Sequence, residues 1–124
     1  MTLEIHPKFW QPLCRRLDNW YRGAVSIRWI QPGGQASLVV DDMPLHAITF
    51  EKKDDACSDT MTIEAGKLDE QPLQHQIIEP FRVLLTKDNE SGRFNELEIL
   101  SETGKTEITF HPGIDSGMLE KLAA

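Results

Sequence analysis

Apolar and polar residues alternate with two different periods along the chain, first that of a helix and then that of strands. Between Pro7 and Arg22 the apolar side chains fall within one arc of about 140° when successive residues are turned by ~100°. Pro7 suits the first turn of a helix, and Gly23 suits the position just past its end. The pattern predicts an amphipathic helix over Pro7–Arg22. The side chains expected to be buried against the rest of the fold are Leu13, Leu17 and Trp20.

From Ala24 onward the period changes to two, which is typical of antiparallel strands with one buried face. Turn residues such as Pro32-Gly33-Gly34 and Glu102-Thr103-Gly104 separate the apolar runs and predict hairpins. Apolar residues at helical spacing predict a short closing helix over Gly113–Leu122. The predicted strands are Ala24–Gln31, Gln35–Asp41, Leu45–Glu51, Asp59–Glu64, Gln74–Glu79, Arg82–Lys87, Phe94–Leu100 and Thr106–His111.

These elements predict a single α+β domain over residues 1–124. The N-terminal amphipathic helix packs on a bent antiparallel sheet, or a partly open barrel, of seven to eight strands, and a short C-terminal helix follows. A flat sheet of that many strands would leave exposed edges and one unburied face, so we expect the sheet to curl.

Composition and charge narrow the classes of function. Apolar residues make up 40% of the chain and charged residues 27%, which is typical of globular proteins. The net charge of -7 and the scattered basic residues argue against nucleic acid as a partner, because phosphate backbones are bound by clustered Lys and Arg. The first residues do not form the basic region followed by an apolar run that is typical of a signal peptide, and the chain has no apolar run of ~18 residues that could span a membrane. We therefore expect a cytoplasmic protein without membrane contact.

The usual signatures of catalysis and of cofactor binding are missing. Gly104-Lys105-Thr106 lacks the earlier glycine of a phosphate-binding loop, and it lies between two predicted strands. Cys14 and Cys57 are too few for a disulfide framework and have no partner at metal-ligand spacing, so reduced thiols are expected. Asp54 and Asp55 are adjacent on the chain, where neighbouring side chains point apart. We therefore predict no catalytic residue and no cofactor.

A register argument separates the two central histidines. Aligning the apolar residues of neighbouring strands sets Ile48 opposite Ile63, and Ile63 opposite His75. His46 then lies two residues further along its strand, about 12 Å from His75 when strands are ~4.8 Å apart and rise by ~3.3 Å per residue. We predict that the two histidines share no metal ion and that backbone or carboxylate groups satisfy them. His111 has the opposite parity to Phe110 and does not complete a site.

The middle of the chain carries a set of short motifs: Ala47-Ile48-Thr49-Phe50-Glu51, then Asp54-Asp55, then Met61-Thr62-Ile63-Glu64, then His75-Gln76-Ile77-Ile78-Glu79-Pro80. With the aromatic-rich helix before them, they resemble a family of small bacterial proteins that is known only as a domain of unknown function. The resemblance runs from about Phe9 to Phe110. It implies this order of elements and no activity.

The sequence therefore leaves the biochemical function unknown. The leading hypothesis is a non-catalytic binding or accessory module whose partner is a protein or a small molecule, and a homo-oligomer is compatible with it. One alternative is a small-molecule carrier with an apolar barrel interior. The other is a small metal-dependent enzyme that uses His46 and His75. If a site exists, its candidate residues are His46, Asp54, Asp55, His75 and Glu79.

Overall fold

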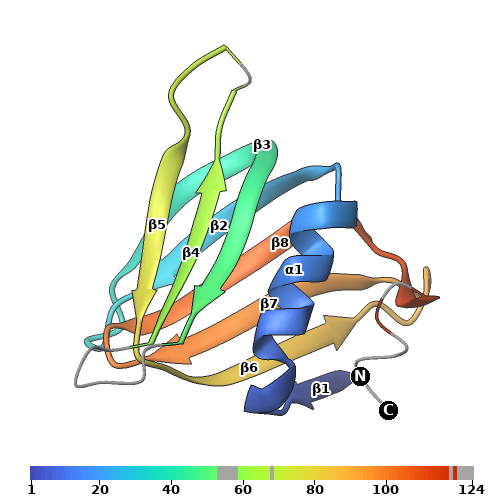
Figure 1. The fold of residues 1–124 in the computed structure, drawn as a ribbon, viewed down its shortest axis with the longest axis horizontal. Coiled ribbons are helices and arrows are strands. Elements are labelled where there is room, and N and C mark those ends of the chain that lie inside the picture. The colour runs from blue at the N-terminus through green and yellow to red at the C-terminus, as the bar shows by residue number, and fades with distance from the viewer. Residues whose placement is uncertain (53–58, 68, 118, 120–124) are drawn as a thin grey trace.

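The computed structural model describes residues 1–52, 59–67, 69–117 and 119, and these form one helix-capped sheet (Figure 1). Its helical elements are the 3-10 helix η1 (Pro7–Phe9) and α1 (Trp10–Trp20). Its strands are β1 (Thr2–Ile5), β2 (Ala24–Ile30), β3 (Ala36–Glu51), β4 (Thr60–Ala65), β5 (Leu73–Ile78), β6 (Pro80–Lys87), β7 (Phe94–Ser101) and β8 (Gly104–Ile114).

All the strands belong to one antiparallel sheet in the order β1-β6-β7-β8-β2-β3-β4-β5. Two meanders, β2 to β5 and β6 to β8, are joined where β8 pairs with β2. The sheet is open, because β1 lies at one end of this order and β5 at the other. The prediction of a bent antiparallel sheet with an N-terminal helix is confirmed, and the sheet does not close into a barrel.

The sheet folds over on itself through β3 (Figure 1). The first half of β3 pairs with β2 and its second half pairs with β4, so one strand runs from one layer into the other. We call the second half of β3 with β4 and β5 the short layer, and the remaining strands the main layer. Asp42 bends the strand with a φ of 51°, and Ser26 supports the bend. The Ser26 hydroxyl accepts the Asp42 N–H at 2.9 Å and donates to Asp41 at 3.2 Å.

The core lies between the two layers and under α1. Inward-facing residues alternate with outward-facing ones along each strand, as in β4 and β7. Ile63 of the short layer and Leu97 and Ile108 of the main layer are fully buried. Each such side chain contributes roughly 1.5–3 kcal/mol by leaving water. The facing side chains of the two layers therefore form one hydrophobic cluster.

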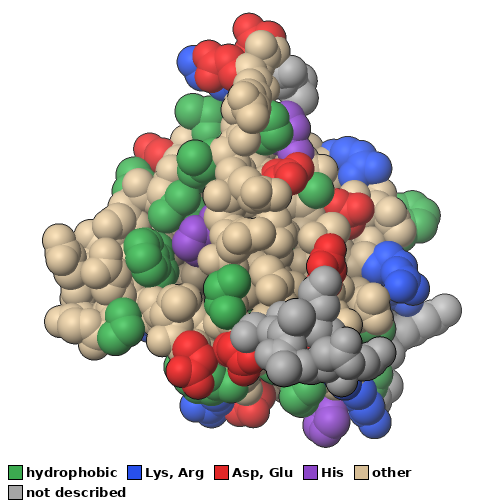
Figure 2. Space-filling model, turned by 60° about the vertical axis from the view of Figure 1, so that its left-hand side comes forward, with side chains coloured by type: hydrophobic (Ala, Val, Ile, Leu, Met, Phe, Trp, Pro, Cys, Tyr) green, Lys and Arg blue, Asp and Glu red, His purple; other side chains and the backbone are tan. Residues whose placement is uncertain are grey.

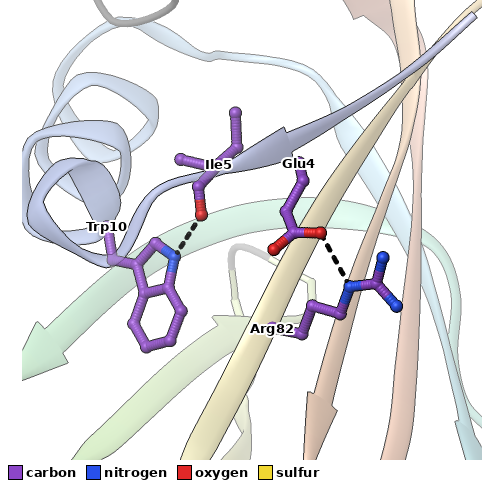
Figure 3. Close-up of polar contacts among 4 residues, drawn as sticks. All are labelled: Glu4, Ile5, Trp10 and Arg82. Atoms are coloured by element: carbon purple, nitrogen blue, oxygen red, sulfur yellow. Dashed lines mark hydrogen bonds and ion pairs between the residues drawn. The ribbon is translucent and has the colours of Figure 1, made fainter.

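α1 lies beside the second half of β3 and covers the core at that side (Figure 1). Trp10, Leu13, Cys14 and Leu17 are its buried residues. The Trp10 indole N–H donates to the Ile5 carbonyl at 2.9 Å and so ties the helix to β1 (Figure 3). Trp20 is 69% exposed, so the prediction that it is buried was wrong. It is the last residue of α1, and the residue that follows it, Tyr21, is buried in the core instead.

Other differences concern the boundaries of elements. Gln35–Asp41 and Leu45–Glu51, predicted as two strands, form the single strand β3, because the chain bends at Asp42 without leaving the sheet. The sequence pattern missed β1. The predicted C-terminal helix is not shown: Gly113 and Ile114 belong to β8, and part of the segment lies outside the described residues.

Candidate functional site

The structure confirms the register that separates His46 from His75. Ile48 pairs with Ile63, and Ile63 pairs with His75. His46 lies further along β3, at a bulge where Leu45 pairs with Ala65 and Ala47 with Glu64. Its Nε2 lies 2.9 Å from the Gly66 carbonyl oxygen, which is the backbone partner expected for it.

His75 reaches from the short layer into the main layer. Its Nε2 lies 3.0 Å from the Thr106 hydroxyl, and its ring contacts Trp29 edge-on with the ring centroids 6.1 Å apart. A hydroxyl therefore satisfies His75, in place of the backbone or carboxylate partner that we predicted. Burial lowers the pKa of His75 from its ordinary value, because the charged ring would lose hydration. His75 of the short layer therefore contacts two strands of the main layer, through Thr106 of β8 and Trp29 of β2.

Of the remaining candidate residues the structure describes only Glu79, which lies apart from the two histidines at the end of β5. Glu79 is exposed, lies between β5 and β6, and has a φ of 55°, which is rare for a residue other than glycine. Its backbone N–H donates to the Asp59 carbonyl at 2.9 Å. Asp54 and Asp55 lie outside the described residues, as does Cys57. Glu79 therefore marks the corner where the chain leaves the short layer for the main layer.

Cys14 is a buried free thiol in α1. Burial, with a smaller contribution from the charge of Asp18, raises the pKa of Cys14 to about 12. A thiol with such a pKa is almost wholly protonated at neutral pH and is a poor nucleophile. Cys14 is thus part of the hydrophobic core.

Three glutamates gather on the outer face of the main layer. They are Glu96 and Glu98 of β7 and Glu107 of β8, and one carboxylate oxygen from each lies within 4.8 Å of the others. Burial, hydrogen bonding to Glu107 and the charge of Glu98 raise the pKa of Glu96. The sequence analysis missed this cluster, although the hairpin turn at Glu102-Thr103-Gly104 would have placed Glu107 beside Glu98. All three side chains are half-exposed.

The free edge of β5 presents unpaired backbone groups. The Glu79 N–H bonds to the Asp59 carbonyl, so this pair is hydrogen-bonded, and such pairs recur at every second residue of an antiparallel ladder. His75 and Ile77 therefore point their backbone groups toward β4. The intervening residues Gln74, Gln76 and Ile78 point theirs to the free edge. Among the described residues, no backbone group is bonded to those of Gln74, Gln76 or Ile78 at that edge.

Two of the other open edges of the sheet are protected. A third runs along the first half of β3 on the side away from β2, where Leu38 is 63% exposed and Asp41 and Asp42 supply charge. β1 is only four residues long and carries Glu4, whose carboxylate pairs with Arg82 at 2.9 Å (Figure 3). The second half of β3 lies beside α1, where Asp18 accepts the Ile48 N–H at 3.1 Å. Natural proteins blunt edges in these ways, with short strands, charges or a covering helix. Within the described part of the chain β5 has none of them: its sequence, Leu-Gln-His-Gln-Ile-Ile, lacks Lys, Asp, Glu and Pro, and no bulge interrupts its pairing with β4.

Exposed apolar side chains flank the β5 edge. Leu73 at the start of β5 is 46% exposed, Ile78 at its end 36%, and Phe81 just beyond the corner 60%. Figure 2, in which the β5 side of the molecule comes forward, shows mostly uncharged side chains and backbone down the centre of this face, with Asp and Glu to the right of the centre and below it and Lys and Arg near the margins. Such side chains could anchor an extended segment at both ends of the strand.

A shallow hollow of about 250 Å³ adjoins this edge on the outer face of the short layer. It is lined by Ala47, Thr49, Glu51, Thr60, Thr62, Glu64, Gln74 and Gln76. The Gln74 amide donates to the Glu64 carboxylate at 3.1 Å. The described lining thus combines neutral polar side chains with two carboxylates, and no basic residue is among them.

Comparison with known proteins identifies the family of the chain. None of the helices formed by the described residues has the length and apolar character needed to cross a membrane. No curated protein matches the chain, and no solved structure does. A family model, described as a family of unknown function (DUF5335), matches residues 1–113, nearly the whole chain. The chain therefore belongs to this family of unknown function, DUF5335.

Proposed function

We propose that the chain is a non-catalytic binding module that takes up an extended segment of a partner protein as an additional strand along β5. The observation that carries this proposal is the set of outward-pointing N–H and C=O groups at Gln74, Gln76 and Ile78 on an unprotected edge. Adding a strand to an exposed sheet edge is a recurrent mode of peptide recognition, in which backbone hydrogen bonds supply affinity and flanking pockets supply specificity.

Several features favour this function over the alternatives. The edge is uncharged over all of β5, while β1 and the second half of β3 are protected and the open side of the first half of β3 carries Asp41 and Asp42. Leu73, Ile78 and Phe81 offer apolar contact where the backbone groups are free. A carrier would need an open interior, whereas the described side chains between the layers, such as Ile63, Leu97 and Ile108, are packed in one hydrophobic cluster. A metal enzyme built on His46 and His75 would need converging ligands, and these histidines have separate partners.

The test removes one outward N–H and leaves the ladder to β4 intact. Peptides are selected from a displayed library of random dodecapeptides, and their affinity is measured for the wild type, Gln76→Pro and Gln76→Ala. Proline lacks the N–H and is tolerated at edge positions, whereas alanine removes the same side chain but keeps the N–H. We expect Gln76→Ala to bind like the wild type and Gln76→Pro to lose at least tenfold in affinity, the effect of about 1.4 kcal/mol.

Hydrogen exchange on the unaltered protein provides a readout that does not depend on a variant. The amides of Gln74, Gln76 and Ile78 should exchange fast in the free chain and become protected when a selected peptide is bound. Amides of His75 and Ile77, which point toward β4, serve as the internal reference. Peptides that bind Gln76→Pro as well as the wild type, or that protect none of the three amides, would refute the proposal.

A further inference from the structure

We infer that the segment bound along β5 carries Lys or Arg on the face that it shares with Gln74 and Gln76. The inference rests on the proposed function and adds the chemistry of the partner. Its basis is the acidic hollow on the outer face of the short layer, which a strand added to β5 would border.

The sheet geometry brings such a basic side chain to Glu64. Glu64 pairs with Gln74, and both side chains line the hollow on the outer face. Neighbouring strands lie ~4.8 Å apart, so an added strand would run about 10 Å from β4. A lysine or arginine opposite Gln74 lies on this same face, and its long side chain can cross over Gln74 to the Glu64 carboxylate. The hollow provides the space for it.

Glu64 has acceptor capacity left for this contact. The Gln74 amide donates to Oε1 at 3.1 Å and so orients the carboxylate toward the β5 edge. An ionised carboxylate has about four lone-pair sites, and this bond uses one of them. Arginine suits such a site best, because its planar fork can bond both carboxylate oxygens.

The charge of the whole chain favours the same partner. At a net charge of -7, the protein attracts basic segments and repels a second copy of itself. Two β5 edges could otherwise pair antiparallel, with Gln76 opposite Gln76 and Gln74 opposite Ile78. That arrangement would place no opposite charge near Glu64. The basic segment is therefore the occupant that we assign to this edge.

The experiment compares two variants, each of which replaces one glutamate by glutamine. Glu64→Gln neutralises the carboxylate in the hollow, and Glu98→Gln neutralises one on the outer face of the main layer. We expect the selected dodecapeptides to be enriched in Lys and Arg at every second position. Their affinity should fall about two- to fivefold for Glu64→Gln, the size of an exposed ion pair, and their salt dependence should weaken. Glu98→Gln should bind like the wild type.

The outcomes separate this inference from the proposed function. If Gln76→Pro still lost at least tenfold in affinity, selected peptides without basic residues, or equal affinities for Glu64→Gln and Glu98→Gln, would overturn the basic partner and leave the proposed function standing. Sedimentation that shows a dimer in the wild type and a monomer in Gln76→Pro, with no peptide bound by either, would identify a second copy as the occupant and also overturn it. Undiminished binding by Gln76→Pro would instead remove the proposed function itself.

Discussion

Asp18 of α1 accepts the backbone N–H of Ile48 at 3.1 Å, so a helix side chain caps an edge of the sheet. Asp18→Ala should leave this N–H without a partner beside the helix and should lower the free energy of unfolding by about 1–3 kcal/mol. Asp18→Asn keeps an acceptor oxygen and should lose less. Urea unfolding of both variants measures the difference. Equal losses would show that the charge of Asp18 matters and the hydrogen bond does not.

The packing of α1 on the sheet predicts contrasting effects at two positions of the helix. Leu17 is fully buried, so Leu17→Ala should lower the free energy of unfolding by about 2–5 kcal/mol through lost burial and a cavity. Trp20 is 69% exposed, and Trp20→Ala should change stability by less than about 0.5 kcal/mol. Thermal or urea unfolding measures both. A larger loss from Trp20→Ala than from Leu17→Ala would contradict the placement of the helix.

The burial of His75 predicts a decline in stability at mildly acidic pH. Its pKa is lowered in the folded chain, so the unfolded chain binds a proton there first. The free energy of unfolding should be intact above about pH 6.5, the ordinary pKa of histidine, and should fall as the pH drops toward the lowered value. Urea unfolding between pH 7.5 and 5 should show a smaller decline in His75→Gln. NMR titration provides the check: a His75 ring that protonates at or above pH 6.5 would be inconsistent with burial.

The three glutamates on the outer face predict a variant that stabilises the fold. Burial is the largest cause of the raised pKa of Glu96, and the charges of Glu98 and Glu107 add to it, so ionisation of the cluster opposes folding at neutral pH. Glu98→Gln should raise the free energy of unfolding by roughly 0.2–1 kcal/mol, the size of a cross-strand charge effect. The gain should shrink as the pH falls through the raised pKa and Glu96 takes up a proton. Glu90→Gln in the exposed β6–β7 turn is the control, and an equal gain there would assign the effect to net charge alone.

Local patterns predicted the elements of the fold well where one face is buried. Alternation aligned Ile48, Ile63 and His75 across three strands, because a slip of one residue would turn every apolar side chain outward. The bend in β3 was misread as a turn because Asp41 and Asp42 are common turn residues. The hydrogen bond that supports this bend comes from Ser26, a residue of another strand.

The candidate site could not be predicted in the same way. Which strand lies at an edge depends on the pairing of β8 with β2 and of β1 with β6, and these contacts join segments far apart in the chain. β1 itself is too short for its alternation to be distinguished from chance. Glu96, Glu98 and Glu107 were within reach of sequence reasoning, since a hairpin turn between β7 and β8 sets their register.

Because β3 runs through both layers, hydrogen exchange of its backbone amides can show whether the two layers unfold together or separately. The Ser37 amide bonds toward β2, because Ser37 pairs with Trp29 two residues from the hydrogen-bonded Gln31 and Gln35. The Thr49 amide bonds toward β4, since the neighbouring Ile48 amide points to α1. If the short layer opens by itself, hydrogen exchange at Thr49 should outpace that at Ser37. If the whole chain opens in one step, the two amides should share a single opening free energy.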